Sequence, residues 1–278
     1  MRTAEIASAG APAHHPYEIG SSKLLDAFGI RRGSRLLSVW AHPDDESYLA
    51  AGLMQAVVAG GGTVVAVTAT LGELGTSDPQ TWPPARLAAH RRVELRAAMA
   101  ELGVDTIVEM GHRDGGCDRV PRTRAAASIA RLIEAHRPDA VVTFGRDGVT
   151  GHPDHRAVAA WVALAVGASA EPPALFVTGS ARSIPGDVVQ RLDELGAYEP
   201  GYPDRTSPPD DDVVARLHGR ALERKLAALA RHASQTEGLR AAFGDAAYAR
   251  FASYEAYRPA NEAARAQMGS RATARWAS

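Results

Sequence analysis

Cysteine is almost missing from this sequence. Its 278 residues include one cysteine, Cys117, so an internal disulfide is excluded and a reducing compartment is expected. No apolar run approaches the roughly 20 residues that a membrane-spanning helix needs, and residues 1–20 lack the apolar stretch of a secretory signal. We therefore expect a cytoplasmic protein with no membrane partner.

The sequence also lacks an excess of charge of either sign. It has 31 basic and 32 acidic residues, and its formal net charge is −1. Such a balance gives no overall field to hold a polyanion, so we expect no nucleic-acid partner.

Domains usually contain roughly 100–200 residues, and α/β folds often run longer as one unit. We expect one domain over residues 1–278, with a mobile arm at 1–20, an irregular excursion at 183–212 and a polar tail at 259–278.

Short apolar and β-branched runs alternate with helical segments along the chain. The runs that predict strands are 35–40, 63–70, 106–110, 140–144 and 174–178, and the first two predict buried strands. The segments that predict helices are 48–59, 87–102, 124–136, 155–166 and 213–233. This alternation is typical of βαβ units. We therefore predict a Rossmann-like α/β fold: an open, mostly parallel sheet with helices on both faces and a C-terminal elaboration.

Two short polar segments follow two of the predicted strands. AHPDDE occupies residues 41–46, directly after the first strand, and GHPDH occupies 151–155, after the fourth. In an open sheet of order 3-2-1-4-5, the first and fourth strands flank the point where the strand order reverses, and ligands bind beyond their carboxyl ends. Aspartates at a helix start are also ordinary caps. Both segments together at this crevice favour a functional site.

The side chains of the two segments suit a divalent metal ion. Imidazole and carboxylate groups bind zinc, although two histidines and one carboxylate would also fit ferrous iron. At these residues the sequence resembles the LmbE-like, or PIG-L, family of zinc-dependent de-N-acetylases, because the two segments look like that family's two signatures. Weaker similarities lie at 70–73, 91–103 and 231–235, so the resemblance covers about 35–240.

The resemblance implies a role for most polar residues of the segments. It makes His42, Asp45 and His155 the ligands of Zn2+, with Fe2+ or another divalent ion as the alternative. It makes Asp44 the general base that takes the proton of the attacking water. It makes His152 either an electrophilic partner of the tetrahedral intermediate or a general acid. These roles suit amide hydrolysis, since a weakly electrophilic carbonyl needs a metal, a base outside the metal shell and a donor to the oxyanion.

Three further residues take supporting roles by the same resemblance. Asp154 would orient His152, while Arg91 and Asp114 sit where relatives contact sugar hydroxyls. The departing amine needs a proton from Asp44 or His152, and the sequence leaves that choice open. The substrate implied is a small-molecule N-acyl amino sugar or its conjugate, and a homo-oligomer is also left open.

One departure from the family narrows the substrate, and two alternatives stay open. The branch that deacetylates the mycothiol precursor has a tyrosine where this chain has Thr150, which favours another N-acyl sugar, for example in a natural-product pathway. An amidase acting on a thiol conjugate would use the same metal site. A non-catalytic Rossmann-like protein that binds a sugar or nucleotide is the alternative from another class, although no G-x-G-x-x-G follows the first strand.

His232 and Gln235 resemble a family feature, and we expect a structural role for them.

Overall fold

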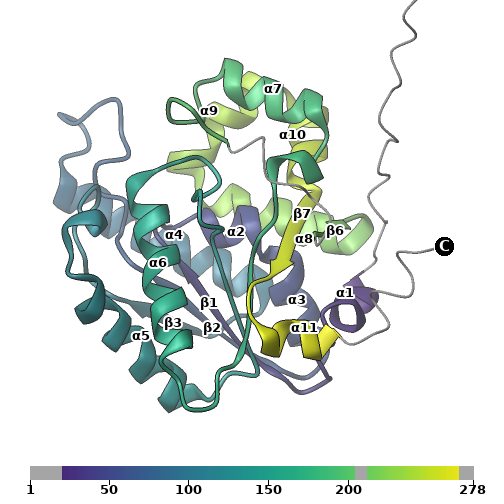
Figure 1. The fold of residues 1–278 in the computed structure, drawn as a ribbon. Coiled ribbons are helices and arrows are strands. Elements are labelled where there is room, and N and C mark those ends of the chain that lie inside the picture. The colour runs from purple at the N-terminus through teal and green to yellow at the C-terminus, as the bar shows by residue number, and fades with distance from the viewer. Residues whose placement is uncertain (1–20, 204–211, 269–278) are drawn as a thin grey trace, which may run out of the picture.

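A computed structural model of the chain describes residues 21–203 and 212–268 (Figure 1). Its seven-stranded sheet has the order β3-β2-β1-β4-β5-β7-β6. The parallel strands are β1 (Arg35–Trp40), β2 (Thr63–Thr68), β3 (Thr106–Glu109), β4 (Ala140–Thr143) and β5 (Ala174–Thr178). Two antiparallel strands, β6 (Val213–Arg216) and β7 (Tyr254–Pro259), extend the sheet beyond β5. The predicted order 3-2-1-4-5 is confirmed.

Helices cover both faces of this sheet (Figure 1). The helices of the parallel half are α1 (Ser21–Ala27), α2 (Asp45–Leu49), α3 (Ala51–Ala59), α4 (Pro84–Leu102), α5 (Arg122–His136) and α6 (Pro153–Gly167). Those that follow β5 are α7 (Gly186–Glu194), α8 (Gly219–Arg231), α9 (Ala233–Phe243), α10 (Asp245–Ala252) and α11 (Glu262–Met268). Helices α5 and α6 pack together on one face, while α3, α4 and α8 pack against one another on the other. The α/β fold with helices on both faces is as predicted.

The chain after β5 differs from the sequence prediction. The helix predicted over 213–233 is wrong at its start, because Val213–Arg216 pairs with β7 and the helix begins only at Gly219. Pairing with a neighbouring strand overrides the local helical preference there. The excursion predicted over 183–212 contains the helix α7, and the tail predicted over 259–278 contains the end of β7 and α11. The expected arm at 1–20 lies outside the described residues, as do 204–211 and 269–278.

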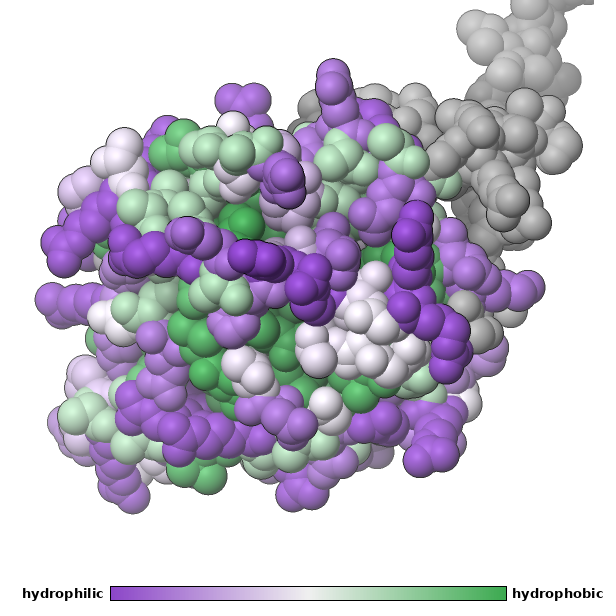
Figure 2. All heavy atoms as spheres, turned by 90° about the horizontal axis from the view of Figure 1, so that it is seen from below, coloured by the Kyte–Doolittle hydropathy of each residue, from purple (hydrophilic) through white to green (hydrophobic). Residues whose placement is uncertain are grey.

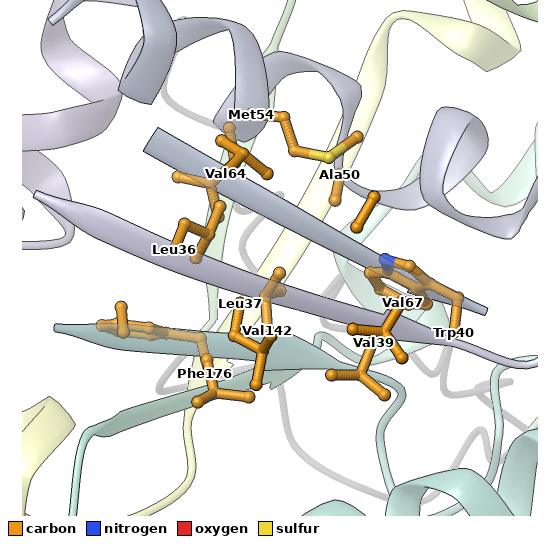
Figure 3. Close-up of a cluster of buried hydrophobic side chains, with 14 of the residues drawn as sticks. Leu36, Leu37, Val39, Trp40, Ala50, Met54, Val64, Val67, Val142 and Phe176 are labelled. Atoms are coloured by element: carbon orange, nitrogen blue, oxygen red, sulfur yellow. The ribbon is translucent and has the colours of Figure 1, made fainter. Parts of the chain in front are cut away.

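The apolar core lies on both sides of β1 and leads directly to the polar segments. Figure 3 shows side chains of β1, β2, β4 and β5 packed with Met54 of α3. At the end of β1, the Trp40 ring meets the edge of Phe144, with their centroids 4.8 Å apart. Phe144 in turn stacks on the imidazole of His155 at 4.2 Å. The core therefore fixes the orientation of a histidine from the second signature.

The outer surface gives no sign of a membrane-spanning element. Within the described ranges 21–203 and 212–268, no helix is both long and apolar enough to cross a bilayer. The face shown in Figure 2 carries mostly hydrophilic side chains around a smaller hydrophobic area. Apolar atoms form a large share of the surface of any folded protein, so this area by itself assigns no partner.

Candidate metal centre

The two polar segments meet at the carboxyl ends of β1 and β4. Strand β1 ends at Trp40, so His42 lies in the turn that leads into α2, and Asp45 is the first residue of that helix. The second segment begins α6, where His152 is the N-cap and Pro153 the first helical residue. Proline suits that position because its missing N–H would have no helical partner there. Both turns therefore hold their polar side chains on the rigid starts of helices.

Three of the predicted ligand residues form a close triangle. Nδ1 of His42 lies 3.1 Å from Nε2 of His155. The Asp45 carboxylate spans the remaining side, with Oδ2 3.6 Å from His42 Nδ1 and Oδ1 3.4 Å from His155 Nε2. Zinc binds nitrogen and oxygen at about 2.0–2.2 Å in a tetrahedron, which separates neighbouring ligand atoms by roughly 3.3–3.6 Å. The residues present therefore fit a zinc ion.

Both histidines of this triangle bond to the protein through their other ring nitrogen. His155 Nδ1 lies 2.9 Å from the carbonyl oxygen of Gly148. His42 Nε2 lies 3.1 Å from Asp114 Oδ1 and 3.3 Å from Asp154 Oδ2. Metal-binding histidines almost always donate their second N–H to a carbonyl or carboxylate, which fixes the tautomer and the ring orientation. This pattern turns His42 Nδ1 and His155 Nε2 towards the triangle.

The glycine at 148 is required for this arrangement. Its φ is +71°, and a Cβ there would come within 2.9 Å of the Cβ of His155. A side chain would therefore disturb both the left-handed backbone and the histidine that bonds to its carbonyl.

Two other groups of side chains in the described chain could also hold a cation. They are His42, His152 and His155, and His42, Asp114 and Asp154, with ligand atoms within 4.8 Å of one another in each. In the second group Asp154 already accepts hydrogen bonds from the backbone N–H groups of Gly115 and Cys117, at 2.8 and 2.9 Å. We favour the triangle with Asp45, because there Asp114 and Asp154 remain free to orient His42.

Acidic side chains dominate the charge around the triangle. Burial raises the pKa of Asp44 to about 6, an effect that Arg91 opposes and Asp45 reinforces. Burial lowers the pKa of His42, but hydrogen bonds to Asp114 and Asp154 outweigh it and raise that pKa to about 10. Both shifts have the cause expected where carboxylates outnumber cations in a buried space. Such a cluster attracts a positive ion.

Arg91 lies beneath the first signature and has protein partners. Its guanidinium donates to the carbonyl oxygens of Gly72 at 2.8 Å and Pro43 at 2.5 Å, and it lies 3.5 Å from the Asp44 carboxylate. Arg91 is 3% exposed. Asp114 is also buried, and its Oδ2 accepts from the N–H of Leu74. The structure thus brings both residues to the site, while their predicted contact with a sugar stays a prediction.

Asp154 contacts two histidines of the site through different groups. Its carboxylate contacts His42 rather than His152, and its side chain is fully buried. His152 instead accepts a hydrogen bond at Nδ1 from the backbone N–H of Asp154, at 3.2 Å. This bond follows from the helix start, because an N-cap side chain turns back to the N–H groups of its own first turn, and the predicted role of Asp154 in orienting His152 stays a prediction. Nε2 of His152 is the ring nitrogen left for other partners.

A glycine in the second signature places an aromatic ring beside His152. A Cβ on Gly151 would overlap the ring of Tyr202, so only glycine allows this contact. The backbone N–H of Glu199 donates to the carbonyl of Thr150 at 2.8 Å, which ties the segment before Tyr202 to the signature. The chain after β5 thus forms one wall next to His152.

A buried contact between Glu46 and His232 at the site was not predicted from the sequence. Glu46 and His232 are 2% and 0% exposed, and Glu46 Oε1 lies 2.9 Å from His232 Nε2. Glu46 Oε2 also accepts from the backbone N–H of Asp44 at 3.1 Å. Because 186 positions separate the pair, no local spacing could join them. The similarity at 231–235 was the only signal in the sequence.

Fold and site together define an open α/β sheet with a histidine and carboxylate cluster at its topological switch point. A sequence model described as GlcNAc-PI de-N-acetylase, PIG-L, matches residues 37–166. A 1D-myo-inositol 2-acetamido-2-deoxy-alpha-D-glucopyranoside deacetylase of Nakamurella multipartita is 35% identical over 244 residues, which cover 73% of this chain and 80% of that protein. The chain belongs to the PIG-L family of de-N-acetylases.

Solved structures support the same fold. A deacetylase of teicoplanin biosynthesis matches with a TM-score of 0.59 and 19% identity over 81% of this chain and 97% of that one. The 4-carboxy-2-hydroxymuconate hydratase GalB of Pseudomonas putida matches with a TM-score of 0.51 and 18% identity over 75% of this chain and 82% of that one. These likenesses establish the fold alone. A hydratase on the same fold means that the reaction must be argued from the site.

Proposed function

We propose that this protein is a metal-dependent hydrolase that removes the N-acetyl group from an amino sugar or amino-sugar conjugate. The observation that carries the proposal is the triangle of His42, Asp45 and His155, with sides of 3.1–3.6 Å, next to a carboxylate outside it. That carboxylate belongs to Asp44, whose side chain is 19% exposed and within reach of a substrate. The deacetylase names of the curated relatives support the same reaction class.

Zinc is the ion we assign to the triangle, with ferrous iron or another divalent ion as the alternative. When bound, the ion would lower the pKa of water towards ~7 and would polarise the amide carbonyl. His42, Asp45 and His155 would hold it through two nitrogens and one carboxylate. Three protein ligands leave a position open, as in catalytic rather than structural zinc sites.

Asp44 serves as the general base in this proposal. It accepts a proton from the water that attacks the acetyl carbon, while the Arg91 guanidinium at 3.5 Å holds the carboxylate in place. General bases of this kind contribute about 10²–10⁴-fold to a rate. The C–N bond then breaks, and acetate and the free amine leave.

His152 stabilises the oxyanion by donating a hydrogen bond from Nε2. Its Nδ1 already accepts the N–H of Asp154, so the neutral ring carries its proton on Nε2. Loss of the Nε2 proton would turn this neutral ring into an imidazolate anion. His152 therefore donates a hydrogen bond and keeps its proton. The proton for the departing amine therefore comes from Asp44, which received it from water.

The substrate we propose is an N-acetyl amino-sugar conjugate other than the mycothiol precursor. The Nakamurella relative is named for a 2-acetamido-glucopyranoside of inositol. In this chain Thr150 occupies the position of that branch's tyrosine, and its short hydroxyl lies 3.4 Å from His155 Nδ1. A natural-product intermediate in the cytoplasm would fit this change. The teicoplanin deacetylase shows that the fold occurs in such pathways.

Metal content tests the site before any substrate is known. We expect inductively coupled plasma mass spectrometry to find about one zinc or iron per wild-type chain, and little in Asp45→Ala, after purification without added metal. Acetate release is then screened with N-acetylglucosaminyl-inositol beside other N-acetylglucosamine conjugates. Absence of metal from both proteins, even after reconstitution, would remove the hydrolase assignment.

A further inference from the structure

The backbone of the proposed general base has an unusual conformation. Asp44 has φ +118° and ψ −32°, a region that residues other than glycine rarely adopt. Such backbone strain persists only where the surroundings impose it, and it clusters at functional sites. The carbonyl of Asp44 accepts from the N–H groups of Ser47 and Tyr48, each at 2.9 Å. Its own N–H donates to Glu46 Oε2 at 3.1 Å. Glu46 therefore contributes directly to holding this conformation.

Glu46 is in turn fixed by two donors. Ser47 Oγ donates to Glu46 Oε1 at 2.7 Å, and His232 Nε2 lies 2.9 Å from the same oxygen. Both Glu46 and His232 are buried, so each bond is shielded from competing water. The second nitrogen of His232, Nδ1, has no hydrogen-bond partner among the described residues. A buried polar atom left without a partner is costly, which packing alone does not explain.

His232 comes from a region that is separate from the two signatures. It lies between α8 and α9, and its carbonyl accepts the N–H groups of Gln235 and Thr236 at 2.9 and 3.0 Å. The family model ends at residue 166, so His232 lies beyond the matched part of the chain. Helix α8 packs against α2, which begins with Asp45. The chain between α8 and α9 thus reaches the first signature through the side chain of His232.

We propose that His232 is a positioning residue for catalysis, which acts through Glu46 to hold Asp44 in its positive-φ conformation. This inference rests on the proposed function, in which Asp44 is the general base. Without the donor at His232, Oε1 of Glu46 loses one of its two hydrogen bonds in a buried space. The carboxylate then moves towards other donors and releases the Asp44 N–H. Asp44 relaxes to an ordinary backbone conformation, and its carboxylate shifts relative to the attacking water.

The test compares two substitutions of His232. His232→Leu removes the donor and keeps an apolar side chain, whereas His232→Gln keeps an amide N–H that can reach the place of Nε2. We expect His232→Leu to lower kcat by about 10- to 100-fold, because small misplacements of catalytic groups cost that much. KM and metal content should stay near the wild-type values, and His232→Gln should recover most of kcat. Ser253→Ala, which removes a buried hydroxyl that donates to the Arg250 carbonyl, is the control for general loss of packing.

Three outcomes would overturn the inference. The first is a wild-type kcat in His232→Leu, and the second is an equal loss in His232→Leu and His232→Gln. The third is loss of metal from His232→Leu. If the wild-type protein binds metal but releases acetate from no sugar, the proposed function fails, and crystal structures then decide the inference separately. If Asp44 keeps its positive φ in the His232→Leu structure, the inference is overturned. If Asp44 has the positive φ in the wild-type structure and an ordinary φ in His232→Leu, the inference is supported.

Discussion

Two clusters of charged side chains, both largely buried, contact α2, and their charges are balanced in different ways. In the first, Asp45, Asp114 and Asp154 lie around His42, and the partly exposed Asp44 precedes Asp45 in the signature. In the second, Lys225 Nζ lies 2.8 Å from Glu255 Oε1 and donates to the Tyr48 carbonyl at 2.6 Å.

The second cluster is complete within the chain. Glu255 Oε1 also accepts the N–H of Gly52 at 2.8 Å, and Oε2 accepts the Tyr257 hydroxyl at 2.7 Å. One buried cation thus meets one buried anion, with hydrogen bonds on the remaining lone pairs. Buried ion pairs are tolerated under these conditions.

The first cluster has more carboxylates than cations. Arg91 contacts Asp44, whereas Asp45, Asp114 and Asp154 all contact His42, and Asp45 also contacts His155. Buried charges require a partner or a metal ion. The first cluster could therefore hold a cation from outside, whereas the Lys225 pair is balanced within the chain.

The largest effect should come from Asp44→Asn, which separates chemistry from metal binding inside the first cluster. The amide has the same shape but cannot accept a proton, so we expect kcat to fall by about 10²–10⁴-fold. Metal content should remain at the wild-type level, because Asp44 lies outside the triangle. Asp45→Asn is the matched control and should lose both metal and activity. Loss of metal from Asp44→Asn would mean that it is a ligand and that the assignment of the two aspartates is reversed.

The second cluster should respond through stability rather than through metal. Lys225→Met removes the cation and leaves Glu255 buried without its charge partner, which should lower the free energy of unfolding by about 3–5 kcal/mol. Burial lowers the pKa of Lys225 while Glu255 opposes that shift, as expected for a buried cation beside a buried carboxylate. Urea denaturation measures the loss.

The double variant Lys225→Met with Glu255→Gln decides whether the loss arises from the unpaired charge. The glutamine carbonyl can still accept from Gly52 or Tyr257 but carries no charge. We therefore expect the double variant to be more stable than Lys225→Met alone. Equal stability of the two variants would show that lost packing of the lysine stem causes the effect.

The parallel half of the fold could be predicted because its signals are local. Strands β1 and β5 are short, largely apolar runs, and both lie where the sequence predicts them, at 35–40 and 174–178. The meeting of His42 with His155 then follows from strand order alone, since both segments follow strands that flank the reversal point.

The antiparallel half could not be predicted because its signals are not local. Strand β6 has only four residues, Val213–Arg216, and becomes a strand by pairing with β7, about forty residues later. The contact between His232 and Glu46 depends on how α8 docks on α2, which no sequence period encodes. The orientation of the Asp154 carboxylate towards His42 depends on the 3-10 turn η1 at Cys117–Arg119. The carboxylate accepts a hydrogen bond from the backbone N–H of Cys117, the first residue of that turn.

Loss of a partly solvent-exposed ion pair should have the smallest effect on stability. Arg92 on α4 donates to both carboxylate oxygens of Glu109, at 2.8 and 2.9 Å from Nε, and the two side chains are 38% and 25% exposed. Exposed pairs contribute about 0.2–1 kcal/mol, because water and salt screen them. Arg92→Ala should therefore lower the free energy of unfolding within that range, and metal content and kcat should not change.

The pH dependence of this small effect has a definite sign. The hydrogen bond that Glu109 accepts from Arg92 lowers the pKa of Glu109 from its ordinary value of 4.5. A carboxylate with a lowered pKa in the folded protein contributes its full stabilisation above the unfolded value, and that contribution is lost as the pH falls through the folded pKa. The difference between wild type and Arg92→Ala in urea denaturation should thus be constant from neutral pH down to 4.5 and shrink below it. A difference that stays constant on acidification would mean that Arg92 stabilises the protein through packing of its stem rather than through the charge of Glu109.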